Sequence, residues 1–350
     1  MNLLYLLSLL ALAMAAQLST MRVMTFNALA NEWARVNWFY SQDPSKAVTQ
    51  APFFCWNHRF PLNIGLIKDK DADVIFLQEV DRYIPEHMHP GEFKPQGCGH
   101  PEGFWKTQLE AMSLDSHFCQ QPRLDPGPTE GIATAWKSRF SLVYREDVVM
   151  REATEHLDGA DPNVAMWTVF RDKSTGDCFI AGNTHLNYRG WGKTIRAHQV
   201  ALLKLKANDL QERFPSCPVI IAGDFNTMPS GPEYAIMVKD EEKINSDAFW
   251  EDLKTHEEKI KFEGKIKEIV SPSSADWDLI RRECLIHPAA TNQLGQLDKI
   301  SHRTPSFEGL LDHIFTIPAR NGNRLILQSL EALPPKEKVG YYPDKTHGSD

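Results

Sequence analysis

The sequence has little positive charge and lacks the cysteine pairs that bind zinc. Lysine and arginine total 38 against 46 aspartates and glutamates, which gives a net charge of −8. A protein that grips long nucleic acid by charge needs a basic stripe, so this balance argues for contact with few nucleotides at most. The six cysteines form no Cys-x-x-Cys pair, which argues against a zinc ribbon, and their even number permits disulfides without predicting them.

Long apolar runs are absent after residue 20, so the sequence predicts no membrane span beyond that point. Residues 3–15 form one uncharged apolar run ending in Ala13-Met14-Ala15, a pattern typical of a signal peptide and its cleavage site. We therefore expect residues 1–20 to direct the chain into the secretory pathway or out of the cell. The alternative is a cytoplasmic protein starting at Met21, because no Lys or Arg precedes the run and no Asn-x-Ser/Thr sequon follows it.

The remaining residues, 21–350, predict one α/β domain. Apolar residues recur at spacings of three and four between positions 200 and 214, which indicates a helix over residues 194–214 with one buried face. Strands and helices mix without strict alternation, so we expect two mixed β-sheets packed face to face with outer helices, a four-layer αββα sandwich. The expected strands are 22–26, 74–77, 131–136, 141–144, 165–170, 177–185, 219–223, 310–317 and 324–330. The other expected helices are 60–70 and 105–114, and residues 240–303 should be irregular with short helices.

The segment 220–229 carries the strongest functional signal. Its apolar run ends abruptly in Asp224-Phe225-Asn226, which predicts a central strand delivering a carboxylate and an amide to the rim of a sheet. Asp224 and Asn226 are two residues apart, so their side chains should share a face. A carboxylate can bind a metal or deprotonate water, and an amide can hold a phosphate oxygen without adding charge. The alternative interpretation is a strand followed by an ordinary Asx turn.

Other polar residues follow apolar runs in the same way. Several carboxylates with His and Asn interleaved and almost no Lys predict a hard-oxygen site that holds Mg²⁺, or Mn²⁺ in its place, and handles phosphate. The candidate residues are Asn27, Glu79, His185, Asp224, Asn226, Asp312 and Asp350.

Eight short motifs cover nearly the whole chain from residue 21. They are MTFN at 24–27, CWNHR at 55–59, DVIFLQEV at 73–80, EGIATAWK at 130–137, NTHL at 183–186, GDFNTMP at 223–229, FEGLLDHIF at 307–315 and HGSD at 347–350. This ordered series resembles the endonuclease/exonuclease/phosphatase superfamily, and most closely its deadenylase-type branch. That branch includes the carbon catabolite repressor 4 nucleases, nocturnin, angel and the 2′,5′-phosphodiesterase.

The resemblance implies a role for each candidate residue. Glu79 would be the principal metal ligand, with Asp350 in or beside the metal shell. Asn27 would help to hold the metal-bound phosphate. His185 would hydrogen-bond the scissile phosphate and stabilise its developing charge, and Asp224 would position or deprotonate the attacking water.

The resemblance breaks down at the end of the sequence. In the family, Asp312 would orient a histidine that directly follows the Ser-Asp pair. Asn226, for its part, would contact the phosphate. The sequence stops at Ser349-Asp350, and His347 is four residues too early to substitute. We therefore expect a truncated sequence with activity lower by roughly 10²–10⁴-fold. Adding a His and a short strand should restore the activity. The alternative is a natural chain that ends there.

Substrate choice depends on two aromatic residues. In the branch, an aromatic residue five positions before the late Asp stacks on a base, and Phe307 occupies that position. Its partner in the branch is a Pro five residues after the His, where this chain has Gly190 followed by Trp191. The clamp is therefore altered, and both aromatics have an alternative interpretation as packing residues. Trp56 and Arg59 are interpreted as structural positions.

Three functions follow as hypotheses. The first is a Mg²⁺-dependent phosphodiesterase that trims RNA or an oligoadenylate from its 3′ end by in-line attack of water, touching few nucleotides. The second is a phosphomonoesterase acting on a nucleotide or a small phosphorylated metabolite, which the acidic net charge favours. The third is an inactive fold that binds nucleotide or a protein partner, supported only by the missing histidine. The sequence contains no leucine-rich repeat, so it gives no evidence for docking to a protein adaptor.

Overall fold

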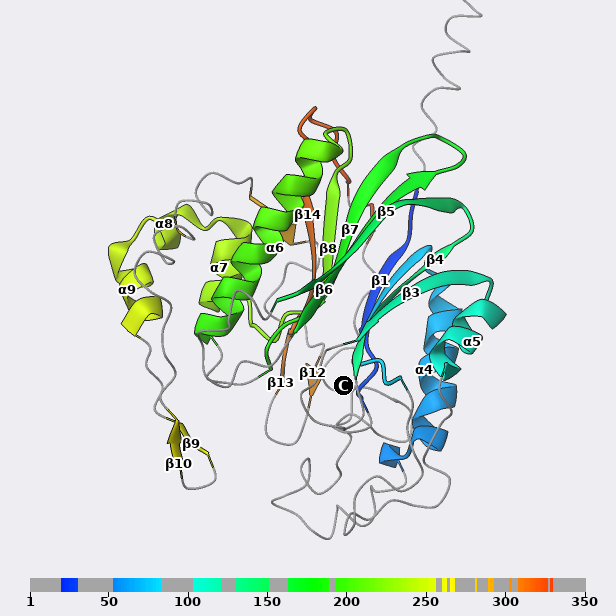
Figure 1. Ribbon diagram of the computed structural model, residues 1–350, viewed down its shortest axis with the longest axis horizontal. Coiled ribbons are helices and arrows are strands. Elements are labelled where there is room, and N and C mark those ends of the chain that lie inside the picture. The colour runs from blue at the N-terminus through cyan, green and yellow to red at the C-terminus, as the bar shows by residue number, and fades with distance from the viewer. Residues whose placement is uncertain are drawn as a thin grey trace, which may run out of the picture.

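The computed structural model describes two mixed β-sheets packed face to face, with helices on the outer side of each (Figure 1). This confirms the αββα sandwich that the sequence predicts. The described residues are 20–30, 53–82, 103–120, 130–150, 163–188, 193–255, 260–262, 265–267, 281, 289–292, 302–303, 308–326 and 328–329. Among them, no helix is both long and apolar enough to cross a membrane.

The smaller of the two main sheets has the strand order β1-β2-β4-β3. Its first two strands are parallel and the other pairs are antiparallel. Two helices cover its outer face in Figure 1, and apolar side chains such as Trp56 and Leu109 pack there against the sheet. The elements are β1 (Val23–Asn27), α4 (Trp56–Lys70), β2 (Val74–Gln78), α5 (Phe104–Ala111), β3 (Leu114–Gln120) and β4 (Gly131–Lys137).

The larger sheet has the order β11-β14-β8-β7-β6-β5. The parallel pair β7 and β8 is joined by the long helix α6, and this helix packs on the outer face of the sheet with α7 beside it. The elements are β5 (Phe140–Val149), β6 (Val164–Asp172), β7 (Cys178–His185), α6 (Lys193–Arg213), β8 (Val219–Asp224), α7 (Pro232–Val238), α8 (Glu241–Ile244), α9 (Asp247–Thr255), β11 (Thr291–Asn292) and β14 (Asp312–Ile317).

The structure corrects some predicted boundaries. The strand expected at 324–330 is wrong, because its described residues carry no strand and Ile326 is 70% exposed. The helix expected at 105–114 ends at Ala111, and the residues after it form β3, whose polar centre concealed it in the sequence. The short helices expected in residues 240–303 are confirmed by α8 and α9. The same stretch also contains the strand pair β9 (Ile260–Phe262) and β10 (Lys265–Lys267), and β12 (His302–Arg303) at its end pairs with β13 (Glu308–Gly309).

A polar bridge joins the two sheets inside an otherwise apolar interface. Phe76 and Phe170 are among the buried residues between the sheets. Gln78 at the end of β2 donates from Nε2 to Oδ1 of Asn183 on β7 (2.8 Å), and Asn183 Nδ2 donates to the carbonyl of Ala133 (2.8 Å). Both amides are fully buried and mutually satisfied, so they fix one sheet against the other. The bridge lies one residue before Glu79 and two before His185, so it sets the spacing of the predicted site.

A disulfide between Cys178 and Cys217 ties the beginning of β7 to the segment just before β8, across 39 residues. We expect the double change Cys178→Ser and Cys217→Ser to lower the free energy of unfolding by roughly 2–4 kcal/mol, because the cross-link restricts the unfolded chain. Denaturant unfolding would measure this, with Ser216→Ala as the control that alters a neighbouring exposed hydroxyl and keeps the bond. Equal stability of the double variant and the control would contradict it.

Candidate active site

The predicted site residues meet where β1, β2, β7 and β8 end and β14 begins. Asn27 lies opposite Gln78 in the parallel pair β1 and β2, so Glu79 follows immediately beyond it. His185 and Asp312 lie on either side of Asp224 in the larger sheet. Directly paired residues on neighbouring strands point to the same face, so these three side chains share one face of that sheet. The prediction that strand ends from both sheets converge at one rim is therefore confirmed.

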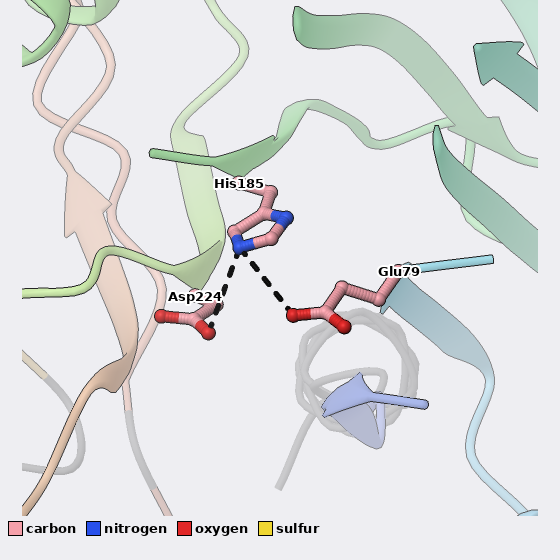
Figure 2. Close-up of side chains that lie close together, drawn as sticks. All are labelled: Glu79, His185 and Asp224. Atoms are coloured by element: carbon pink, nitrogen blue, oxygen red, sulfur yellow. Dashed lines mark ion pairs between the residues drawn. The ribbon is translucent and has the colours of Figure 1, made fainter. Parts of the chain in front are cut away.

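Glu79, His185 and Asp224 form the centre of this rim. One ligand atom from each lies within 4.8 Å of the others, and all three side chains are buried. Figure 2 shows the imidazole directed toward both carboxylates, with Nε2 3.8 Å from Glu79 Oε1 and 3.9 Å from Asp224 Oδ2. These separations exceed hydrogen-bond length, and neither ring nitrogen bonds another described residue. His185 can therefore use Nε2 for a ligand placed between the two carboxylates.

Asn27 separates the two carboxylates. Its Nδ2 donates to Glu79 Oε1 (2.9 Å) and to Asp224 Oδ2 (3.0 Å). Its Oδ1 accepts from the backbone N–H of Leu29 (2.9 Å), and this bond assigns the amide oxygen and nitrogen. A neutral group with two donors thus offsets the repulsion between two buried carboxylates without adding a charge of its own.

The turn after β1 supplies a further donor to Glu79. The backbone N–H of Ala30 donates to Glu79 Oε2 (2.8 Å). Leu29 at φ 54° and Glu79 at φ 53° both adopt the left-handed region, which is uncommon for residues other than glycine. The fully buried Arg59 of α4 donates from Nη1 to the carbonyls of Ala28 and Leu29 and so holds this turn. These contacts agree with the interpretation of Arg59 as a structural residue.

Asn226 serves the turn after β8 and adopts the left-handed conformation (φ 48°) beyond the end of the strand, so the strand alternation expected to place it on the face of Asp224 does not reach it. Its N–H donates to Asp224 Oδ1 (2.8 Å), so the Asx turn offered as an alternative interpretation does form. Its Nδ2 donates to the carbonyl of Leu186 (3.0 Å), directly after His185. The amide therefore links the two strand ends.

The remaining predicted residues divide into two groups. Asp312 is half-buried beside Asp224, and it is not in the group of three ligand atoms that converge among the described residues. Asp350, Phe307 and Trp191 lie outside the described residues. Sequence reasoning missed the buried residues that hold the strand ends, among them Asn63, which donates to the Ala28 carbonyl (3.2 Å). The one available signal was its position four residues after Arg59, on the same face of α4.

His313, which follows Asp312 on β14, should make stability depend on pH. Burial lowers the pKa of His313 to about 4, although its hydrogen bond to the Thr227 carbonyl (2.9 Å) and the Asp224 carboxylate act in the opposite direction. The unfolded chain takes up this proton below about pH 6.5 and the folded protein only near pH 4, so acid favours unfolding. Protonation of this residue should lower the free energy of unfolding by about 2 kcal/mol between pH 7 and pH 5.

Denaturant unfolding of the wild type and His313→Gln at these two pH values would measure that loss. Gln keeps a donor for the Thr227 carbonyl and does not titrate, so the variant should lose less stability than the wild type. Parallel loss in both proteins would show that other groups cause the pH dependence.

The donor set fits a hard divalent cation. Two buried carboxylates face each other across a short gap, with further oxygen acceptors at the rim. Mg²⁺ takes such oxygen ligands and keeps several waters, so it needs few protein ligands. Mn²⁺ accepts the same oxygen ligands and the imidazole as well. The chemistry open to this arrangement is activation of a metal-bound water against a phosphoryl group.

Comparison with known proteins agrees with this arrangement. The sequence profile of the Endonuclease/Exonuclease/phosphatase family matches residues 56–316. Protein angel homolog 2 of Bos taurus is 28% identical over an alignment of 199 residues that covers 53% of this chain and 32% of that protein. The 2′,5′-phosphodiesterase 12 of Homo sapiens is 27% identical over 312 residues, covering 80% of this chain and 42% of that protein. The chain thus spans less than half the length of these curated relatives.

The fold is also shared with a solved structure. The crystal structure of ANGEL2, a 2′,3′-cyclic phosphatase, superposes with a TM-score of 0.62 at 20% identity, covering 95% of this chain and 96% of that one. Together with the angel and carbon catabolite repressor 4 relatives, this confirms the resemblance to the deadenylase-type branch.

Proposed function

The chain belongs to the endonuclease/exonuclease/phosphatase family, and on that premise we propose that it is a Mg²⁺-dependent phosphodiesterase acting on the 3′ end of RNA or an oligoadenylate. Nuclease- and phosphodiesterase-type relatives support the general activity. The observation that carries the proposal is the convergence of Glu79, His185 and Asp224, with His185 Nε2 directed toward both carboxylates and bonded to no other described residue.

Each residue has one task in the proposed reaction. Glu79, held by Asn27 and the Ala30 N–H, binds the cation, which supplies charge neutralisation to the phosphate when present. Asp224 accepts the proton of the attacking water or holds that water in line with the bond that breaks. His185 donates to a nonbridging phosphate oxygen and stabilises the charge that develops there. Asp350 would complete the metal shell and Asp312 would orient a further histidine.

The substrate proposal is a short oligonucleotide. A net charge of −8 offers little attraction for a long polyanion, so recognition would rest on the terminal nucleotides and on stacking by Phe307 and Trp191. One relative is named as a 2′,5′-phosphodiesterase, which makes a 2′,5′-linked oligoadenylate the first alternative linkage to examine. The same acidic charge favours the second candidate function, a phosphomonoesterase acting on a nucleotide.

One experiment separates these substrates. The full chain would be incubated with 3′,5′-linked oligo(A), 2′,5′-linked oligo(A) and a mononucleotide, each with Mg²⁺, with Mn²⁺ and with EDTA. Metal-dependent release of 5′-mononucleotides from an oligomer supports the phosphodiesterase. Release of inorganic phosphate from the mononucleotide alone would favour the phosphomonoesterase. No release from any substrate, in an assay able to detect the roughly 10⁴-fold lower activity expected for this sequence, would overturn both proposals.

We also propose that the protein matures in an oxidising compartment. Cys178 and Cys217 form a disulfide, and Cys55 is disulfide-bonded as well. Such bonds persist mainly in secreted proteins and the secretory pathway, which agrees with the signal-like residues 1–20. Expression in a secreting eukaryotic cell should yield protein in the medium with a new N-terminus near residue 16; retention in the cytosol with Met1 or Met21 intact would contradict this.

A further inference from the structure

We infer that Arg196 and Glu233 act as a positioning pair that fixes His185 and Asn226 relative to each other. Arg196 lies in the first turns of α6 and Glu233 in the first turn of α7, and these helices lie side by side on the outer face of the larger sheet (Figure 1). The inference deepens the proposed phosphodiesterase and rests on it for its kinetic part.

The pair connects the two strand ends that carry the site. Arg196 Nε donates to Glu233 Oε1 (2.8 Å), and Arg196 Nη1 donates to the carbonyl of Asn187 (3.0 Å), two residues after His185. Glu233 Oε2 accepts from the hydroxyl of Thr227 (2.9 Å), directly after Asn226. The ion pair therefore spans from the end of β7 to the turn after β8.

A second branch from the same helix reaches His185 itself. Gln199 accepts from the Asn187 N–H (3.1 Å) and donates from Nε2 to Oδ1 of Asn163 (2.8 Å). Asn163 in turn donates to the backbone carbonyl of His185 (3.0 Å). Since the His185 ring has no hydrogen bond to another described residue, the placement of the ring depends on this backbone and on packing.

Stability alone is a weak reason for such a pair. The side chains of Arg196 and Glu233 are 6% and 1% exposed, so both charges have lost nearly all their hydration. Apolar residues of similar volume often match or exceed the stability of a buried ion pair, whereas its directional bonds fix geometry. The backbone atoms that it holds, at Asn187 and through Thr227, flank the two residues assigned to the phosphate.

Arg196→Lys and Thr227→Val test the inference, with Thr227→Ser as the rescue and Lys206→Met as the control. Lys keeps the charge of Arg196 but carries all its donors on one nitrogen, so it cannot reproduce the two bonds that separate guanidinium nitrogens make to Glu233 and to the Asn187 carbonyl. Val removes only the Thr227 hydroxyl, and Ser restores it. Lys206 lies further along α6, away from the site, and pairs there with Glu146 of β5 (2.7 Å).

We expect Arg196→Lys and Thr227→Val to lower kcat by roughly 10–100-fold, the scale expected for a misplaced reacting group. The Mg²⁺ concentration for half-maximal activity should stay within twofold, because Glu79 is held by other residues. Thr227→Ser and Lys206→Met should keep the wild-type kcat. Wild-type kcat in both Arg196→Lys and Thr227→Val would overturn the inference, as would an equal loss in Lys206→Met.

An activity-free measurement separates this inference from the proposed function. The His185 ring resonances, assigned by NMR, should shift in Thr227→Val and return in Thr227→Ser. If the wild type cleaves no phosphoester but this shift appears, the function fails and the positioning role stands. If the wild type is active but neither the resonances nor kcat change, the positioning role fails and the function stands.

Discussion

Glu79→Gln is expected to lower kcat/KM by about 10³-fold and to remove saturation by Mg²⁺. The carboxylate contributes a negative charge to the cation site, and both of its oxygens also accept hydrogen bonds, from Asn27 Nδ2 and from the Ala30 N–H. A glutamine side chain has one acceptor and one donor group. Whichever way the amide turns, its NH₂ group faces another donor, so the variant loses a buried hydrogen bond as well as the charge.

Initial rates over a range of Mg²⁺ concentrations, together with calorimetric Mg²⁺ binding, would measure this loss. The matched control is Glu110→Gln, which removes an exposed carboxylate from α5 that pairs only at the surface with Lys106. It should leave both rate and Mg²⁺ binding unchanged, since exposed pairs contribute little. Retention of more than a tenth of the wild-type rate in Glu79→Gln would remove Glu79 from the role of principal metal ligand.

The centre of the site could be predicted because each of its residues follows an apolar run that has to be buried. Val219–Asp224 and Cys178–His185 form neighbouring parallel strands, and this pairing brings Asp224 and His185 to the rim that the sequence predicted. Glu79 follows from the same argument applied to Val74–Gln78. Apolar burial is a local property of a strand, and together with the ordered series of family motifs it selected these three residues.

The supporting bonds could not be predicted, because they join residues far apart in the sequence. The amide of Asn27 reaches Asp224 across 197 positions, and Gln78 reaches Asn183 across 105. Nor could the sequence select Cys178 and Cys217 from six cysteines. The strand expected at 324–330 is wrong because its apolar run Leu325–Leu327 predicts burial, whereas Ile326 is 70% exposed.

His185→Phe is expected to lower kcat by roughly 10²–10³-fold while the fold and the half-saturating Mg²⁺ concentration stay near their wild-type values. Replacing His185 leaves no other described residue without a hydrogen-bond partner, because its ring nitrogens bond none of them. Phe keeps a planar ring of similar size, so the loss of stability should be small and the loss of rate should report the missing donor. Thermal unfolding and Mg²⁺-dependent kinetics would check both parts.

His185→Gln separates a donor from an acid in the same position. The Nε2 atom of His185 points between Glu79 and Asp224, and the amide NH₂ of Gln can approach that position as a neutral donor (Figure 2). If His185 stabilises the phosphate by hydrogen bonding, the His185→Gln variant should be about tenfold more active than His185→Phe. If it must transfer a proton, Gln and Phe should be equally slow. Wild-type activity in His185→Phe would exclude both roles and leave Asp224 as the residue that acts on the attacking water.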